Sequence, residues 1–213
     1  MADRSSLTGA LWYADRAAGI TALVLLTISV CLGMGLAGRA RSRRWPAFAI
    51  EDVHRYLGLL TGGFIGIHAL TILLDSYVPY SLTQLLAPGT APSRTMAVAA
   101  GVVSAEVLIA LAVTNRFRKS LSFAFWRKAH YLNFAVWILA LGHGIAAGTD
   151  SDQRWAVFLY AACAAAVAGL LAWRVLAKRA VESWEMSVWP TVTAIVVGEL
   201  IVALTYGPLG HHA

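Results

Sequence analysis

Two apolar segments of the chain begin and end with a histidine: HRYLGLLTGGFIGIH at residues 54–68 and HYLNFAVWILALGH at residues 130–143. Ionisable side chains inside a bilayer are costly and rare, and they usually mark a functional site. A single membrane histidine can instead form a hydrogen bond between two helices. Four histidines at closely matched separations, 14 and 13 residues, favour a shared site over four unrelated hydrogen bonds.

The composition indicates that lipid is the solvent around these segments. Of the 213 residues, 59% are hydrophobic and 13% are charged, whereas a soluble domain has roughly 45–50% apolar and about 25% charged residues. Six segments reach the ~20 residues that cross about 30 Å of hydrocarbon. We therefore predict an all-α, integral membrane bundle of six transmembrane helices, forming a single transmembrane domain over residues 1–213. The expected spans are 17–38, 54–74, 95–114, 129–149, 155–173 and 188–207.

The charges in the loops predict the orientation of the spans. The net charge of +6 comes mostly from Lys and Arg in short loops, a distribution that sets topology and does not indicate nucleic-acid binding. Because cytoplasmic loops are enriched in these residues, we expect loops one, three and five in the cytoplasm and both termini extracytoplasmic, in a multi-pass protein of the cell membrane. The basic residues of these loops are Arg39, Arg41, Arg43 and Arg44, then Arg116, Arg118, Lys119, Arg127 and Lys128, then Arg174, Lys178 and Arg179.

Two other classes of site are not indicated by the sequence. Cys31 and Cys163 are far apart and lie inside apolar runs, so they predict neither a disulfide framework nor a CxxC site. Gly62 and Gly63 lie within a span and not between a strand and a helix, so they are no nucleotide fingerprint. We therefore expect no flavin or nicotinamide site in this chain.

The spacing of the histidines predicts how they pair. At ~1.5 Å rise per residue, His54 and His68 are about 21 Å apart, and His130 and His143 are about 19.5 Å apart. The two spans run in the same direction, so His54 pairs with His130 at the cytoplasmic end and His68 pairs with His143 at the other end. Thirteen residues fall about 140° short of four helical turns. Tilt, local overwinding or different rotamers must therefore aim the imidazoles of the second segment.

Facing imidazoles at one level on neighbouring helices suit the axial ligation of a haem iron. We predict two b-type haems between the second and fourth spans. Ligation by two histidines leaves iron no open coordination position, so the expected task is electron transfer. Small residues near the histidines would give the macrocycles room, although they also serve close helix packing. These residues are Gly58, Gly62, Gly63, Gly66, Gly142 and Gly144.

Aromatic and acidic residues within the spans have open roles. Trp137 and Phe64 lie between the two histidine levels and are candidate electron relays, or else ordinary core or lipid-facing residues. Glu106 and Glu199 lie in the third and sixth spans. Proton transfer and a neutral structural role both stay open for these carboxyl groups.

Three arginines are candidate partners for anionic haem propionates. Arg16 begins the first span on the extracytoplasmic side, and Arg55 and Arg127 flank the cytoplasmic histidines. Each is also placed where a snorkelling or topology-setting arginine is expected.

Four stretches together carry a family resemblance: WYADRAAG at 12–19, HRYLGLL at 54–60, DSY at 75–77 and FWRKAHYLNFAVWILALGHGIAAGTD at 125–150. Over residues 11–175 the chain resembles the ferric reductase-like transmembrane domain family, which includes ferric reductases, the membrane part of NADPH oxidases and the haem-binding subunit of a bacterial methionine sulfoxide reductase system. The resemblance implies two b haems, the inner one on His54 and His130 and the outer one on His68 and His143. It also implies electron flow from a cytoplasmic donor toward the other face.

The sequence thus predicts a dihaem b-type cytochrome that relays electrons to an extracytoplasmic acceptor, such as ferric iron, oxygen or a protein partner. In place of the flavin and nicotinamide domain of the oxidases, it continues into an extra sixth helix at 188–207. We therefore expect an oxidoreductase membrane subunit, embedded in lipid, that needs a separate flavoprotein reductase or a quinol donor. The alternative is a non-redox haem-binding or haem-carrying membrane subunit.

Overall fold

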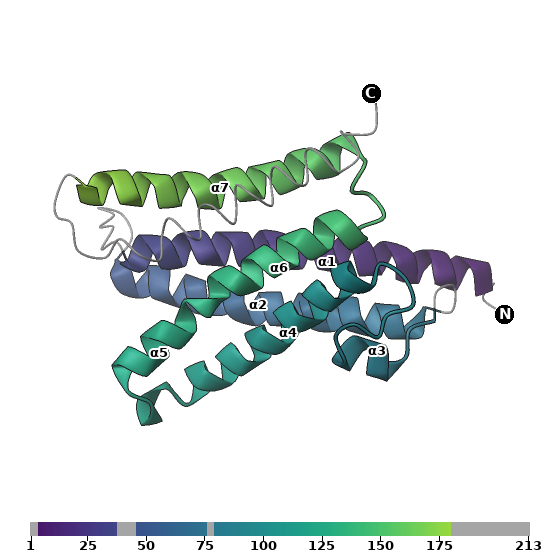
Figure 1. Cartoon of the computed structure of the whole chain (residues 1–213), viewed down its shortest axis with the longest axis horizontal. Coiled ribbons are helices and arrows are strands. Elements are labelled where there is room, and N and C mark those ends of the chain that lie inside the picture. Colours follow the sequence, from purple (N-terminus) through teal and green to yellow (C-terminus); the bar gives the residue numbers. More distant parts are fainter. Residues whose placement is uncertain (1–3, 38–45, 76–78, 180–213) are drawn as a thin grey trace. The chain divides into compact units, whose positions relative to one another are not determined.

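A computed structural model describes residues 4–37, 46–75 and 79–179, and all regular secondary structure in these ranges is helical (Figure 1). The chain divides into two compact units, one of Met1–Leu25 with Leu59–Gly148 and the other of Leu26–Gly58 with Thr149–Ala213. Helices α1 and α2 each contribute to both units. The elements are α1 (Arg4–Ala37), α2 (Ala47–Leu74), α3 (Leu82–Leu86), α4 (Thr95–Arg116), the 3₁₀ helix η1 (Arg118–Ser120), α5 (Phe123–His130), α6 (Leu132–Ala147) and α7 (Arg154–Arg179).

Five of the predicted spans are present as helical segments long and apolar enough to cross a membrane. The first, second and fourth begin earlier than expected, at Gly9, Phe48 and Phe123, because a helix satisfies its own backbone hydrogen bonds and can continue past the apolar segment into polar surroundings. The sixth predicted span, 188–207, lies outside the described residues. The five segments are Gly9–Ala37, Phe48–Leu74, Thr95–Arg116, Phe123–Ala147 and Arg154–Leu176.

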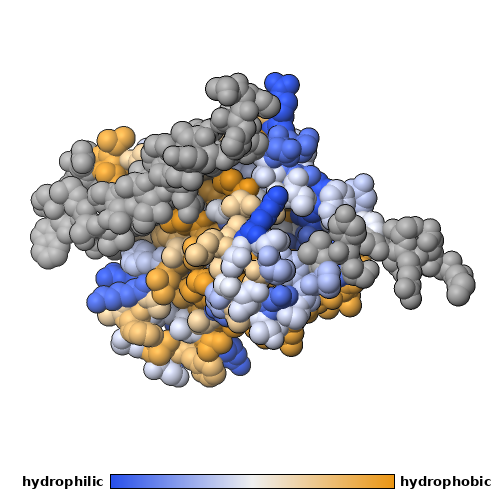
Figure 2. All heavy atoms as spheres, turned by 45° about the vertical axis from the view of Figure 1, so that its right-hand side comes forward, coloured by the Kyte–Doolittle hydropathy of each residue, from blue (hydrophilic) through white to orange (hydrophobic). Residues whose placement is uncertain are grey.

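The outer faces of these helices carry large apolar side chains. Leu59 and Phe158 are each 73% exposed and Ile109 is 64% exposed, and orange apolar residues lie beside polar ones on the surface drawn in Figure 2. A soluble protein rarely exposes apolar surface on this scale. The multi-pass membrane location predicted from the sequence therefore explains why these side chains are outside.

The first unit has its core where α4 packs against α6. Trp137 and Val136 of α6 are completely buried, and Leu111 of α4 is almost so. Between the two helices the Ser104 hydroxyl donates to the carbonyl of Val136 at 2.9 Å. A small polar residue that satisfies its hydrogen bond across the interface lets two helices approach closely inside a membrane.

Arg94 determines where α6 ends. It precedes α4 with a left-handed backbone (φ 47°), and its guanidinium donates to the carbonyls of Ala147 at 3.1 Å and Gly148 at 3.4 Å. The last carbonyls of a helix have no partner within the helix, and a basic side chain can satisfy them. This cap holds the end of α6 one turn beyond His143.

The second unit contains the remainder of α1 and α2 together with α7. Val167 and Leu171 of α7 and Met34 of α1 are buried, and Arg174 donates to the carbonyl of Met34 at 2.6 Å. Cys31 and Cys163 are free thiols, half-buried and buried respectively. Within this unit the hydrogen bond from α7 satisfies a carbonyl near the end of α1.

Candidate functional site

His68 of α2 and His143 of α6 lie next to each other within the first unit. Their ring centroids are 6.2 Å apart and their planes are at 77°. The two histidines are 75 residues apart in the sequence, and the structure places them at the same level, as the helical spacing required. His54 belongs to the second unit and His130 to the first, and the pairing of these two stays a prediction.

Three of the four histidines point their Nδ1 atom at a backbone carbonyl of a neighbouring helix. The distances are 3.0 Å from His54 to Ser29, 3.0 Å from His68 to Asp15 and 2.8 Å from His143 to Ala97. A carbonyl oxygen can only accept, so Nδ1 must carry the proton, and in the neutral ring Nε2 then carries the lone pair. Histidines that bind metals commonly donate their other ring N–H to a carbonyl or carboxylate in this way.

Glycine makes each of these contacts sterically accessible. In an α-helix the carbonyl of residue i faces residue i+4, and in all three cases residue i+4 is a glycine against which the imidazole packs. A Cβ atom added there would lie 3.1 Å, 3.2 Å or 2.7 Å from the nearest ring atom of His68, His54 or His143, respectively. The three carbonyl–glycine pairs are Asp15 with Gly19, Ser29 with Gly33, and Ala97 with Gly101.

The sequence contains a signal for part of this arrangement that our sequence reasoning missed. Gly19 and Gly33 are 14 residues apart on α1, the same separation as His54 and His68 on α2. Equal separations on two neighbouring helices allow both histidines to dock in the same way. Gly101 has no such partner in the sequence, so only the packing of α4 on α6 reveals its role.

The glycines on α2 that were expected to give room have a different environment. A Cβ atom added at Gly58, Gly62, Gly63 or Gly66 would meet no atom of the described chain within 4 Å. Close helix packing, the alternative explanation, is therefore not observed at these positions within the described residues. At these four positions α2 carries no side chain between or beside its two histidines, so haem clearance stays a prediction.

His130 lies in a different setting, at the end of α5. The Trp126 ring stacks on its imidazole with centroids 5.1 Å apart and planes at 22°. The guanidinium of Arg118 in turn lies 4.1 Å from the Trp126 centroid, and the Trp126 N–H donates to Asn115 at 2.8 Å. A cation and an indole ring thus extend outward from this histidine toward the exposed basic residues of the α4–α5 connection.

The predicted fourth span, 129–149, is not one regular helix, because Tyr131 separates α5 from α6. The Tyr131 N–H bonds to the Lys128 carbonyl at 3.2 Å and the Phe134 N–H to the Tyr131 carbonyl at 3.1 Å. Bonds of this i to i−3 type wind the chain at about 3.0 residues per turn instead of 3.6. This turn is therefore overwound, which is one of the three adjustments that the 13-residue spacing required.

The predicted arginines all contact neighbouring side chains. The Arg16 guanidinium lies 3.8 Å from the Trp12 ring centroid. Arg16 directly follows Asp15 in the sequence, and Asp15 contacts His68. Arg55 is exposed and lies 3.8 Å from Asp52, and the Arg127 guanidinium is 5.6 Å from the Phe123 centroid. Of the three, Arg16 is the one at the level of the His68–His143 pair, and propionate binding stays a prediction for all of them.

The other candidate residues differ in burial. Trp137, between the two histidines of its segment, is completely buried, and Phe64 is half-buried. Glu106 is exposed on α4, and its role stays open. Glu199 lies outside the described residues. The relay role of the two aromatic residues remains a prediction.

The separation of the His68 and His143 rings is compatible with ligation of one haem iron. First-row metals bind imidazole nitrogen at about 2 Å, and that nitrogen is about 1 Å from its ring centroid, so two axial imidazoles place their centroids about 6 Å apart. The observed separation is 6.2 Å. Within residues 4–37, 46–75 and 79–179, no three His, Cys, Asp or Glu side chains are grouped to hold a bare metal ion, whereas haem needs only two ligands from the protein.

The model of the family described as "Ferric reductase like transmembrane component" matches residues 18–141, more than half of the chain. The matched region contains three of the four histidines and ends two residues before His143. No curated protein and no solved structure matches the chain. The expectation drawn from the sequence motifs is thus confirmed, and the chain belongs to the ferric reductase like transmembrane component family.

Proposed function

We propose that this chain is a dihaem b-type cytochrome that relays electrons across the cell membrane to an extracytoplasmic acceptor. Membership of the family and the five membrane-crossing helices support a transmembrane redox role. The observation that carries the proposal is the His68–His143 pair, with its 6.2 Å separation and both Nδ1 atoms bound to carbonyls. That arrangement leaves both Nε2 lone pairs for one iron.

In this proposal each haem has one ligand from α2 and one from the α5–α6 segment. His68 and His143 would hold the outer haem, and His54 and His130 the inner one. A haem bound by two imidazoles supplies a one-electron iron centre with no open position. The docked Nδ1 atoms hold the rings in place, so that little rearrangement accompanies gain or loss of an electron.

The connection between α4 and α5 is the proposed entry side for electrons. The connection and the two helices that flank it carry exposed basic side chains, and Trp126 stacks on His130. Complementary charge speeds the encounter of redox partners, so this cluster supports an acidic flavoprotein as the donor. A quinol remains the other candidate donor. The basic residues are Arg116, Arg118, Lys119, Arg127 and Lys128.

The optical spectrum of the purified protein tests this proposal. We expect two haems per chain with low-spin b-type bands in the reduced-minus-oxidised difference spectrum. Replacing His68 or His143 by Ala should each remove the same single haem, because each change removes one of its two ligands. His211→Ala, a histidine change outside all four predicted ligands, should leave two haems. A wild-type protein that binds no haem would refute the proposal.

Reduction kinetics distinguish the remaining functions. A redox cytochrome should be reduced and reoxidised without losing haem. A haem carrier should instead release haem to an apoprotein acceptor within the time that reduction and reoxidation take. Reduction by a menaquinol analogue compared with a reduced flavoprotein then identifies the class of donor. Reduction by neither donor, together with fast haem release, would favour the non-redox alternative.

A further inference from the structure

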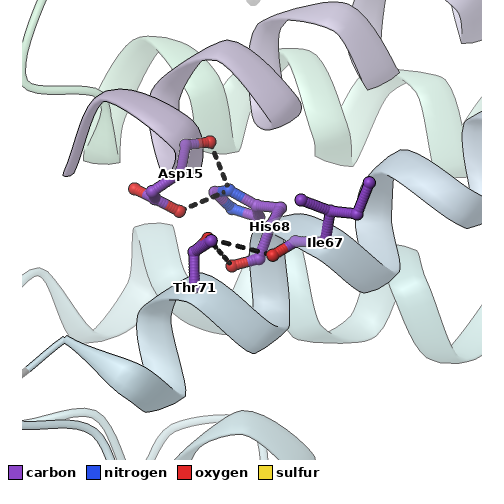
Figure 3. Close-up of polar contacts among 4 residues, drawn as sticks. All are labelled: Asp15, Ile67, His68 and Thr71. Atoms are coloured by element: carbon purple, nitrogen blue, oxygen red, sulfur yellow. Dashed lines mark hydrogen bonds and ion pairs between the residues drawn. The ribbon is translucent and has the colours of Figure 1, made fainter. Parts of the chain in front are cut away.

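A carboxylate on α1 contacts the proposed outer ligand. Asp15 Oδ1 lies 2.7 Å from His68 Nδ1, and the backbone carbonyl of the same residue lies 3.0 Å from that nitrogen (Figure 3). The side chains of His68 and Asp15 are only 25% and 26% exposed. Carbonyl docking is shared with His54 and His143, so the carboxylate is an addition at His68.

The geometry shows how the carboxylate acts. The Nδ1–H is directed at the carbonyl oxygen, so Asp15 Oδ1 is buried within ion-pair distance of the ring but receives no hydrogen bond from the described residues. Its main effect on the imidazole is therefore electrostatic. On the other side of His68, the Thr71 hydroxyl donates to the carbonyls of Ile67 and His68, both at 2.9 Å, which holds the α2 backbone that carries the ligand.

We propose that Asp15 is a positioning residue that holds His68 with Nε2 toward the iron and lowers the reduction potential of the outer haem. This inference rests on the proposed function, since it requires a haem on His68. A carboxylate beside the N–H of a metal-bound imidazole makes the ring a more basic ligand. A more basic ligand and a nearby negative charge both favour Fe(III) over Fe(II).

The direction and size of the effect follow from the charge. Reduction adds one electron to Fe(III) to give Fe(II), with both imidazoles retained and no bond formed or broken. The electron comes from the flavin or quinol donor of the proposed function. An iron held by Nε2 of His68 would lie about 6–7 Å from the carboxylate, and Coulomb's law at an effective dielectric constant of about 20 would then change the equilibrium constant for reduction by tens-fold.

The consequence concerns the direction of electron flow. A haem of lower potential is a stronger reductant once it carries an electron. The Asp15 carboxylate would therefore favour discharge of the outer haem to an extracytoplasmic acceptor. Arg16, the next residue, lies over Trp12, so the acidic and basic side chains at this level have different contacts on α1.

Redox titration of the wild-type protein and of three variants tests the inference. Asp15→Asn removes the charge and keeps the size, Asp15→Glu restores the charge, and Asp152→Asn removes a matched charge from an exposed loop position. Haem content is measured first, so that a wild-type protein without haem refutes the proposed function and not only this inference. The haem optical bands then report the two potentials separately from any turnover.

We expect Asp15→Asn to raise the equilibrium constant for reduction of one haem at least tenfold, which is about 59 mV for a one-electron couple. The other haem should change less than threefold, Asp15→Glu should recover most of the wild-type value, and Asp152→Asn should change neither haem. An Asp15→Asn variant with two haems and unchanged potentials would overturn the inference.

If Asp15→Asn loses a haem, Asp15→Glu decides the question. The inference requires the glutamate variant to keep two haems, with the affected potential within threefold of wild type in equilibrium constant. Two results would contradict an electrostatic role for the carboxylate. In the first, the glutamate variant also loses the haem. In the second, it keeps the haem but its equilibrium constant for reduction is raised tenfold or more.

Discussion

Changing Gly101 to Ala should remove the outer haem while leaving the inner one. A Cβ atom at this position would lie 2.7 Å from Nδ1 of His143 and 2.8 Å from Cε1 and Cγ of the same ring. These are atoms of a rigid imidazole and not the end of a flexible chain, so the ring must move. Reaching ordinary contact requires a shift of roughly 0.7 Å or more, because packed interiors leave no free space for the added methyl group.

Such a shift has two costs in the folded protein. It lengthens the 2.8 Å hydrogen bond between His143 and the Ala97 carbonyl, a loss of about 0.5–1.5 kcal/mol. Overpacking adds about 1–3 kcal/mol, while replacing a mid-helix glycine by alanine returns up to about 1 kcal/mol. We therefore expect a net destabilisation of roughly 0.5–4.5 kcal/mol and a ring displaced from its position beside His68.

The assay is haem per chain, measured from the pyridine haemochrome spectrum, together with thermal unfolding of the haem-free protein. Gly169→Ala on α7 is the matched control, since its added Cβ would meet no described atom within 4 Å. Gly19→Ala and Gly33→Ala, at 3.1 Å and 3.2 Å from their histidines, should have weaker effects. A Gly101→Ala protein with two haems and wild-type spectra would refute the docking argument.

Two further predictions concern α4 and the entry side. Trp126→Leu should slow reduction of the haems by a flavoprotein several-fold without loss of haem, because it removes the ring stacked on His130. Stopped-flow reduction measures this rate. The control is Phe125→Leu, which changes an exposed aromatic residue on the same helix, and an equal effect of this variant would argue against a specific electron path through Trp126. Ser104→Ala should destabilise the packing of α4 on α6 by about 1 kcal/mol, because it removes the 2.9 Å hydrogen bond to Val136; a melting temperature equal to wild type would contradict it.

Much of the fold could be predicted because its determinants are local along the chain. An apolar run of about 20 residues must span as a helix, since lipid offers no hydrogen bonds to the backbone. The rise per residue of a helix then predicts that His68 and His143 lie at the same level along their helices, without any knowledge of packing. The exact ends of the helices were less accurate, because Gly9 and Phe48 lie in helices that extend beyond the apolar runs. The break at Tyr131 was also not located in advance.

The sequence by itself determined that this chain is a helical membrane protein with histidines at two levels, because hydropathy and helical period are properties of consecutive residues. Only the tertiary structure identified the contacts that orient those histidines. An imidazole contacts the Ala97 carbonyl, Gly101 or the Asp15 carboxylate only when α1 and α4 pack against the helices that carry the histidines. Such contacts join residues 42 to 53 positions apart, and the angle at which two helices face each other is determined by packing and not by local sequence.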